Sequence, residues 1–267
     1  MGLADVHAHL THHRLAADVD AVLARARSAG VTTIIANGLN PSDNEAVLAL
    51  ARRHPSVRPA FGLYPVDAVL PELRALGRDY PRAGDGASPA QGIEWVREHV
   101  AEAVAVGEIG LDGHWVPEAL WTRQEEVFRA MVRLALDADK PLIVHTRRRE
   151  RRAFELLRET GASRVCWHCF GGKVNLARDI ATHGHWLSIP ANARRSESFT
   201  RMLETLPRER VLLETDCPYL SPERARDSEP ADVAATAAYA AELWRVSQVE
   251  VVARTSENFE RLFGVPP

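Results

Sequence analysis

The sequence has 267 residues, of which 46% are hydrophobic and 26% are charged, and its formal net charge at pH 7 is -3. This length suits one (β/α)₈ barrel, and the composition is that of a globular protein with a sizeable core. The small negative charge excludes a protein that binds nucleic acid through an overall basic surface, although it permits a local basic rim. Three cysteines, two of them in one segment, argue against a disulfide framework and favour a reducing compartment.

The amino-terminal residues, MGLADVHAHL, lack the basic start and apolar stretch of a signal peptide. No apolar run approaches the length of about 20 residues that spans a bilayer. We therefore expect a cytoplasmic protein that does not associate with a membrane.

Short apolar runs alternate with amphipathic patterns along nearly the whole chain, which predicts alternating strands and helices. Strands are predicted at residues 3–9, 31–37, 57–64, 103–112, 141–146, 163–170, 185–190 and 210–216. Helices are predicted at residues 18–30, 44–54, 93–103, 118–139, 154–161, 174–184 and 198–206, with one or two more in 231–263. Residues 80–92 are rich in proline and glycine and are predicted to be a loop.

Repeated strand–helix units predict parallel strands, and eight of them favour a closed barrel. We expect residues 1–267 to form a single TIM-barrel domain, in the α/β class. The alternative is an open doubly wound sheet, but no GxGxxG motif follows the first strand, which weakens the nucleotide-binding version of that fold.

Side chains that can bind metal ions stand at the ends of the predicted strands. They are Asp5, His7, His9, Glu108, His145, His168 and Asp216. Because strand ends converge on one face of a barrel, residues far apart in sequence become neighbours there. His7 and His9 are two residues apart, so both are expected to point into the barrel mouth.

Four histidines and two carboxylates exceed the three protein ligands that one catalytic zinc ion uses. We therefore expect two divalent ions that share a bridging carboxylate, about 3.5–4 Å apart, as in sites that activate water. Imidazole with carboxylate suits zinc, manganese or iron(II), whereas magnesium prefers oxygen and water. The two ions are expected to be zinc, manganese or magnesium.

Glu108 is the expected bridge. Some barrel hydrolases use a carboxylated lysine at a strand end for this role, but Lys140 and Lys173, the two lysines of the sequence, are not placed at strand ends. Asp216 is expected both to bind metal and to accept a proton from the attacking water, as a general base does. Glu214 lies two residues earlier on the same face and is expected deeper in the barrel.

Arginines follow His145 in the run RRRERR at 147–152. Most are expected on a solvated helix face, but Arg147 is close enough to the predicted metal site to hold a phosphate bidentately. Arg194 and Arg195 are expected to add to this rim. Cys166, Cys169 and Cys217 are interpreted as buried small side chains rather than metal ligands or nucleophiles.

The ordered motifs resemble the TatD family of metal-dependent deoxyribonucleases, within the amidohydrolase-like barrels. The motifs that carry this resemblance are DVHAHL, GEIGLD, PLIVHTR, HCFGG, ETDCPYL and ENFERLF. The resemblance implies one ion held by His7, His9, Glu108 and Asp216, and a second held by Glu108, His145 and His168. It also implies hydrolysis of DNA phosphodiesters, often from the 3′ end, on single strands or 3′ ends.

Two departures from the family pattern bear on the substrate. GLYP places Tyr64 where the family usually has a histidine. After ETDCPYL the family commonly shows Arg-Gly and then Asn-x-Pro, whereas RARDSEP keeps Pro230 without the asparagine. Tyr64 and Tyr219 join Arg147 as expected substrate contacts.

Three other functions remain open. The first is hydrolysis of an acyl ester, such as the clearing of aminoacyl groups from tRNA, and the second is phosphatase activity on small molecules. The third is a metal-bound barrel with a partner-binding role. Partner proteins in a repair or defence assembly are also compatible with the sequence.

Overall fold

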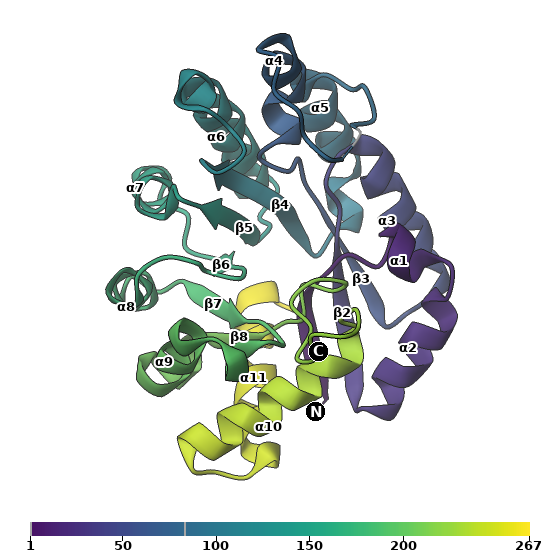
Figure 1. Cartoon of the computed structure of the whole chain (residues 1–267), viewed down its shortest axis with the longest axis vertical. Helices are drawn as coiled ribbons and strands as arrows, with labels where there is room; N and C mark the ends of the chain where they lie inside the picture. Colours follow the sequence, from purple (N-terminus) through teal and green to yellow (C-terminus); the bar gives the residue numbers. More distant parts are fainter. Residues whose placement is uncertain (1, 83) are drawn as a thin grey trace.

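The computed structural model describes residues 2–82 and 84–267. Within them, eight parallel strands pair in chain order and form a barrel with helices around it (Figure 1). The strands are β1 (Leu3–Ala8), β2 (Val31–Asn37), β3 (Val57–Phe61), β4 (Ala105–Asp112), β5 (Leu142–Arg147), β6 (Val165–Trp167), β7 (Trp186–Ile189) and β8 (Val211–Leu213). The prediction of a (β/α)₈ barrel is confirmed, and the open doubly wound sheet is excluded.

Most α-helices of the described residues surround the barrel. They are α1 (His13–Ala16), α2 (Val19–Ser28), α3 (Pro41–Arg53), α4 (Leu70–Ala75), α5 (Pro89–His99), α6 (Trp121–Asp137), α7 (Glu150–Thr160), α8 (Val174–Thr182), α9 (Glu197–Thr205), α10 (Val233–Trp244) and α11 (Gln248–Phe263). No helix in this part of the chain is long and apolar enough to cross a membrane.

The prediction of a loop at residues 80–92 is wrong at its carboxyl-terminal end, because α5 already begins at Pro89. The Ser88 hydroxyl caps this helix by accepting a hydrogen bond from the amide N–H of Gln91. The side-chain oxygen of Gln91 in turn accepts a hydrogen bond from the amide N–H of Ser88. This reciprocal capping box satisfies two helix-end donors. The third strand also ends earlier than predicted, at Phe61 rather than residue 64.

Backbone contacts between β1 and the segment after β8 close the barrel. Ala8 and Cys217 form a parallel bridge, and the amide of His9 donates to the carbonyl of Cys217 at 2.9 Å. The amide of Asp216 donates to the carbonyl of His7, also at 2.9 Å. The seam of the barrel therefore lies among predicted ligand residues.

The apolar core has two main parts. A large layer lies between strands and helices, and an interior cluster fills the barrel itself. The buried members of the interior cluster are Val6, Ile35, Ala60, Ala105, Ile143, Cys166, Trp186, Leu212, Phe259, Leu262 and Phe263. The last three belong to α11, which also contacts the starts of β1 and β8 through Ser256 and Asn258. Helix α11 therefore closes the amino-terminal end of the barrel and leaves the carboxyl-terminal end for the site.

Candidate metal centre

Register shifts in two strands turn the predicted ligands into the barrel. Along β1, Val6 belongs to the interior cluster but Ala8 belongs to the outer layer, and the pairing with β2 shifts between Asp5 and Ala8. The shift lets His7 and His9 point inward. Irregularities of this kind often re-aim side chains beside active sites.

The same device acts in β4. Strict alternation from Ala105, an interior residue, would place Glu108 on the helix side of the sheet. The pairing with β5 shifts between Val106 and Ile109, so Ile109 packs outward. Glu108 consequently points into the barrel mouth, where it is 2% exposed.

Glycines make room for the backbone around Glu108. A Cβ atom at Gly62 would lie 2.3 Å from both the backbone nitrogen and the backbone oxygen of Glu108. At Gly110 the φ angle is +149°, and a Cβ atom would lie 1.9 Å from the carbonyl oxygen of His145. Both positions therefore require glycine, which gives a physical reason for the second glycine of the GEIG sequence.

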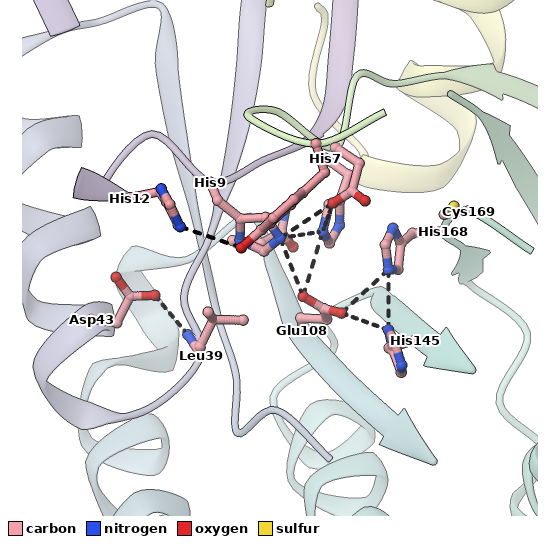
Figure 2. A network of polar contacts seen from close by, with 12 residues as sticks. His7, His9, His12, Leu39, Asp43, Glu108, His145, His168 and Cys169 are labelled. Atoms are coloured by element: carbon pink, nitrogen blue, oxygen red, sulfur yellow. Dashed lines mark hydrogen bonds and ion pairs between the residues drawn. The ribbon is translucent and has the colours of Figure 1, made fainter. Parts of the chain in front are cut away.

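Glu108 stands at the centre of the site, and each of its carboxylate oxygens faces a different group of side chains (Figure 2). Oε2 lies 3.5 Å from Nε2 of His7 and 3.6 Å from Nε2 of His9. Oε1 lies 3.0 Å from Nδ1 of His145 and 3.2 Å from Nε2 of His168. One carboxylate therefore joins two separate clusters of nitrogen atoms.

Asp216 completes the group on the Oε2 side. Its Oδ1 lies 3.3 Å from Nε2 of His9 and 3.6 Å from Nε2 of His7, and those two nitrogens are 3.2 Å apart. Asp216 has a φ angle of +56°, which is uncommon for a residue with a side chain. Such local strain is found at functional sites, where surrounding contacts hold it in place.

The charges of the site depend on one another. Burial alone would raise the pKa of Glu108, but the facing His168, His145 and His7 hold it well below its usual range. The burial of His168 would lower its pKa, yet Glu108 and Glu214 raise it well above the ordinary histidine value. The Glu108 carboxylate is therefore ionised at neutral pH, and its negative charge stabilises positive charge on the groups around it.

The donor set fits divalent cations. Oε2 of Glu108, the oxygen that faces Nε2 of His7 and Nε2 of His9, is buried without a hydrogen-bond partner among residues 2–82 and 84–267. Ligands about 2.1 Å from a tetrahedral ion lie roughly 3.4 Å apart. The measured separations on the Oε2 side, from 3.2 to 3.6 Å, match those edges. His7, His9 and Asp216, and likewise His7, Glu108 and His168, bring one ligand atom each within 4.8 Å of one another.

Asp112 is a site residue that sequence reasoning missed. Its Oδ2 accepts a hydrogen bond from Nε2 of His145 at 3.1 Å, so it fixes the ring that presents Nδ1 to Glu108. Its Oδ1 accepts from the amides of His114 and Trp115. Carboxylates in this position orient metal-binding histidines. The signal was the aspartate that ends GEIGLD, two residues beyond Gly110 on the same side of the strand.

Glu214 and Asp5 contact residues next to the metal centre and do not themselves belong to the group of ligand atoms around Glu108. Glu214 is fully buried, accepts from the amide of Cys169 at 2.8 Å and lies 3.6 Å from Nδ1 of His168. Asp5 accepts from the amide and the hydroxyl of Thr215, at 2.9 and 2.5 Å. Its carboxylate therefore belongs to the seam between β1 and the segment after β8, and not to the group of ligand atoms around Glu108.

A pocket of about 750 Å³ opens above the cluster. Arg147, Tyr64 and Tyr219 all line it. Arg147 is exposed, the Tyr64 ring lies 5.0 Å from the His145 ring, and Tyr219 is 47% exposed. The structure therefore places all three expected substrate contacts around one opening.

The arginine runs differ from their predicted roles at three positions. Arg149 is not solvated: it is 7% exposed, contacts Glu125 and lies 4.0 Å above the Trp121 ring. Arg194 pairs with Glu242, and Arg195 donates to the carbonyl of Ser221. These contacts hold the two side chains on neighbouring segments instead of leaving them free for a rim.

Comparisons with known proteins find similar sequences over nearly the whole chain. Residues 4–264 match the family model described as TatD related DNase. The chain is 30% identical to Deoxyribonuclease TATDN3 of Homo sapiens over 275 residues, covering 98% of this chain and 95% of the human protein. It is also 30% identical to the 3'-5' ssDNA/RNA exonuclease TatD of Enterobacter lignolyticus, covering 98% of both chains.

The fold is similar to that of a solved relative. The crystal structure of YJJV, a TatD homolog from Escherichia coli K12, superposes with a TM-score of 0.84 and 26% sequence identity. The match covers 99% of this chain and 98% of that protein. The likeness therefore extends over the barrel and the segments that carry the site.

Proposed function

Because this chain belongs to the TatD related DNase family and is a metal-dependent hydrolase of ester bonds, we propose that it cleaves phosphodiester bonds of DNA from a 3′ end. The proposed substrate is single-stranded DNA or the unpaired 3′ end of a duplex. Support for the polarity comes from the similarity to a relative named as a 3'-5' ssDNA/RNA exonuclease.

The observation that carries the proposal is the position of Glu108 between two groups of nitrogen atoms. We propose that Glu108 bridges two divalent cations. His7, His9 and Asp216 would complete one coordination sphere, and His145 and His168 the other. Bound there, two divalent cations lower the pKa of water and stabilise the oxygens of a displacement at phosphorus.

The remaining steps belong to the protein's own side chains. The burial of Asp216 would raise its pKa, but the hydrogen bond from His9 and the charges of His168 and His7 lower it, so the carboxylate is ionised. It can therefore accept a proton from the attacking water as the water oxygen bonds to phosphorus, while the bond from phosphorus to the oxygen of the leaving nucleotide breaks. Arg147 is proposed to hold a nonbridging phosphate oxygen, and Tyr64 and Tyr219 to contact the neighbouring nucleotides.

A metal titration tests this function. Purified protein is incubated with single-stranded DNA labelled at its 5′ end, in the presence of Mg²⁺, Mn²⁺ or Zn²⁺ in turn. We expect a ladder that shortens from the 3′ end and disappears with chelator and in Glu108→Ala. If no metal supports cleavage while two ions per chain are bound, the nuclease proposal is wrong, and acyl esters and small phosphates become the substrates to test.

A further inference from the structure

We propose that two aromatic walls flank the metal centre and that each stacks one of the two nucleobases beside the scissile phosphodiester. This inference rests on the proposed function and deepens it, because it names the parts of the substrate that the pocket recognises. It assigns roles to Tyr80, Trp115 and His12, which are not part of the metal centre.

The first wall, here called the Tyr80 wall, consists of Tyr64, Tyr80 and Trp115. The rings of Tyr80 and Trp115 lie 5.2 Å apart at an interplanar angle of 75°. All three side chains line the pocket and pack against a separate apolar cluster. The buried members of that cluster are Val66, Val69, Leu70, Leu73 and Val116. This backing holds the rings in place, so a base that stacks on them does not have to order them first.

Arg82 strengthens the Tyr80 wall. Its guanidinium carbon lies 5.4 Å from the ring centre of Tyr64 and 5.7 Å from that of Tyr80. It pairs with Asp67, whose side chain is 5% exposed and which also accepts from Asn40 at 3.1 Å. The guanidinium is therefore held at the pocket, where it adds a flat cationic surface beside the rings.

The second wall, here called the Tyr219 wall, consists of Tyr219, His12 and Arg14. The Tyr219 hydroxyl lies 3.3 Å from Nε2 of His12, and Arg14 lies 5.0 Å from the Tyr219 ring centre. Arg14 is held in turn by Asp227 at 2.6 Å. Tyr219 is nevertheless 47% exposed, so ring surface is open to a ligand.

The two walls lie next to different histidines of the metal centre. The Tyr64 ring lies 5.0 Å from the His145 ring, and the Tyr219 ring lies 6.4 Å from the His9 ring. His145 and His9 face different oxygens of Glu108, as Figure 2 shows. A phosphodiester bound at the centre would therefore have one nucleotide directed toward each wall.

Charge and aromatic surface together match single-stranded nucleic acid. Arg147 and Arg148 are exposed and line the same pocket, where they can follow the phosphate backbone. Proteins that bind single strands combine a cationic groove with rings on which unpaired bases stack. A paired base is already stacked within its duplex, so the walls require an unpaired strand.

The test pairs changes in the protein with changes in the DNA. Three oligonucleotides are compared: one unmodified, one abasic at the 3′-terminal nucleotide and one abasic at the penultimate nucleotide. Their terminal linkages are phosphorothioates that resist cleavage, and binding to the metal-loaded protein is followed by fluorescence anisotropy. The variants are Tyr219→Ala for one wall and Trp115→Leu and Tyr80→Leu for the other, with Tyr219→Phe as the control that keeps the ring.

Each wall should respond to one base. We expect Tyr219→Ala to bind the unmodified strand roughly 5- to 150-fold more weakly, the range for losing one base stack. It should bind one abasic strand as well as the wild type does. Trp115→Leu and Tyr80→Leu should show the same pattern with the other abasic strand, and Tyr219→Phe should bind all three like the wild type.

Other patterns contradict the walls. The inference is wrong if a variant weakens all three strands by the same factor, if both walls pair with the same base, or if no variant weakens binding. Binding and cleavage also separate the two proposals. The expected binding pattern without cleavage of ordinary DNA would remove the nuclease function and keep the walls, whereas cleavage without the pattern would do the reverse.

Discussion

The two ends of the barrel both bury histidines, but they use them in opposite ways. At the amino-terminal end, Nδ1 of His185 accepts from the Trp167 indole at 3.1 Å, and Nε2 donates to the carbonyl of Ala162 at 2.8 Å. At the carboxyl-terminal end, Nε2 of His7 and Nε2 of His9 lie 3.2 Å apart and face carboxylates.

This difference separates a structural histidine from a ligand histidine. His185 is fully buried and has both nitrogens paired within the protein, so one neutral tautomer is complete. In His7 and His9, by contrast, the two Nε2 atoms face each other as well as acceptors, and Nδ1 of each ring has no hydrogen-bond partner among the described residues. Burial is the same at both ends, and what distinguishes them is whether the hydrogen bonds are complete.

The largest effect is expected at Asp216. Replacing Asp216 with Asn keeps an oxygen near His9 but removes the proton acceptor, so turnover should fall by about 10²- to 10⁴-fold. The measurement is kcat on labelled DNA at saturating metal, with metal content determined by mass spectrometry. Turnover equal to that of the wild type would remove the base role. Loss of activity in step with loss of bound metal would leave Asp216 as a ligand only.

The next effect concerns acid stability at the opposite end. Burial, as the largest cause, lowers the pKa of His185 to about 4. As pH falls from about 6.5 toward 4, His185 binds a proton in the unfolded chain but stays neutral in the folded protein. The unfolding free energy should therefore fall with decreasing pH, by up to about 1.4 kcal/mol per pH unit from this residue.

Urea unfolding at several pH values measures that slope. His185→Gln keeps one acceptor for Trp167 and one donor for Ala162 but cannot be protonated, so its slope should be shallower than that of the wild type. His13→Gln, which removes an exposed histidine of α1, is the control. A His185→Gln protein with the wild-type slope would show that His185 does not limit acid stability.

A smaller effect is expected at Asp112. In Asp112→Asn the amide nitrogen would face Nε2 of His145, and the ring would take its proton on Nδ1, the atom directed at Glu108. Metal affinity and turnover should each fall by about 10- to 100-fold. Competition with a fluorescent chelator measures the affinity. Asp43→Asn, at a carboxylate that accepts from Thr11 and the amide of Leu39, provides the control, and an equal loss there would contradict a specific role for Asp112.

Much of the fold was predictable because strand and helix patterns alternate with little interruption. The gathering of ligand residues also followed from one rule, that strand ends share a face of the barrel. The direction of Glu108 did not follow, because alternation from Ala105 points it the wrong way and the correction is a register shift with β5. Such a shift depends on pairing between strands and leaves no local pattern.

Other misses have different causes. The start of α5 was visible in the sequence, since Ser88 and Gln91 have capping-box spacing, but the surrounding glycines and prolines masked it. The burial of Arg149 against Trp121 and Glu125 joins α6 to the start of α7 and could not be read from a run of arginines. The Tyr80 wall is likewise assembled from separate loops.

The seam of the barrel has a consequence for how the protein is made. His7 and His9 are synthesised about 200 residues before Asp216 and the segment that pairs beside them. A growing chain on the ribosome therefore carries His7 and His9 before Asp216 has been made. The complete centre is assembled only after β8 and the segment that follows it have been made and have joined β1.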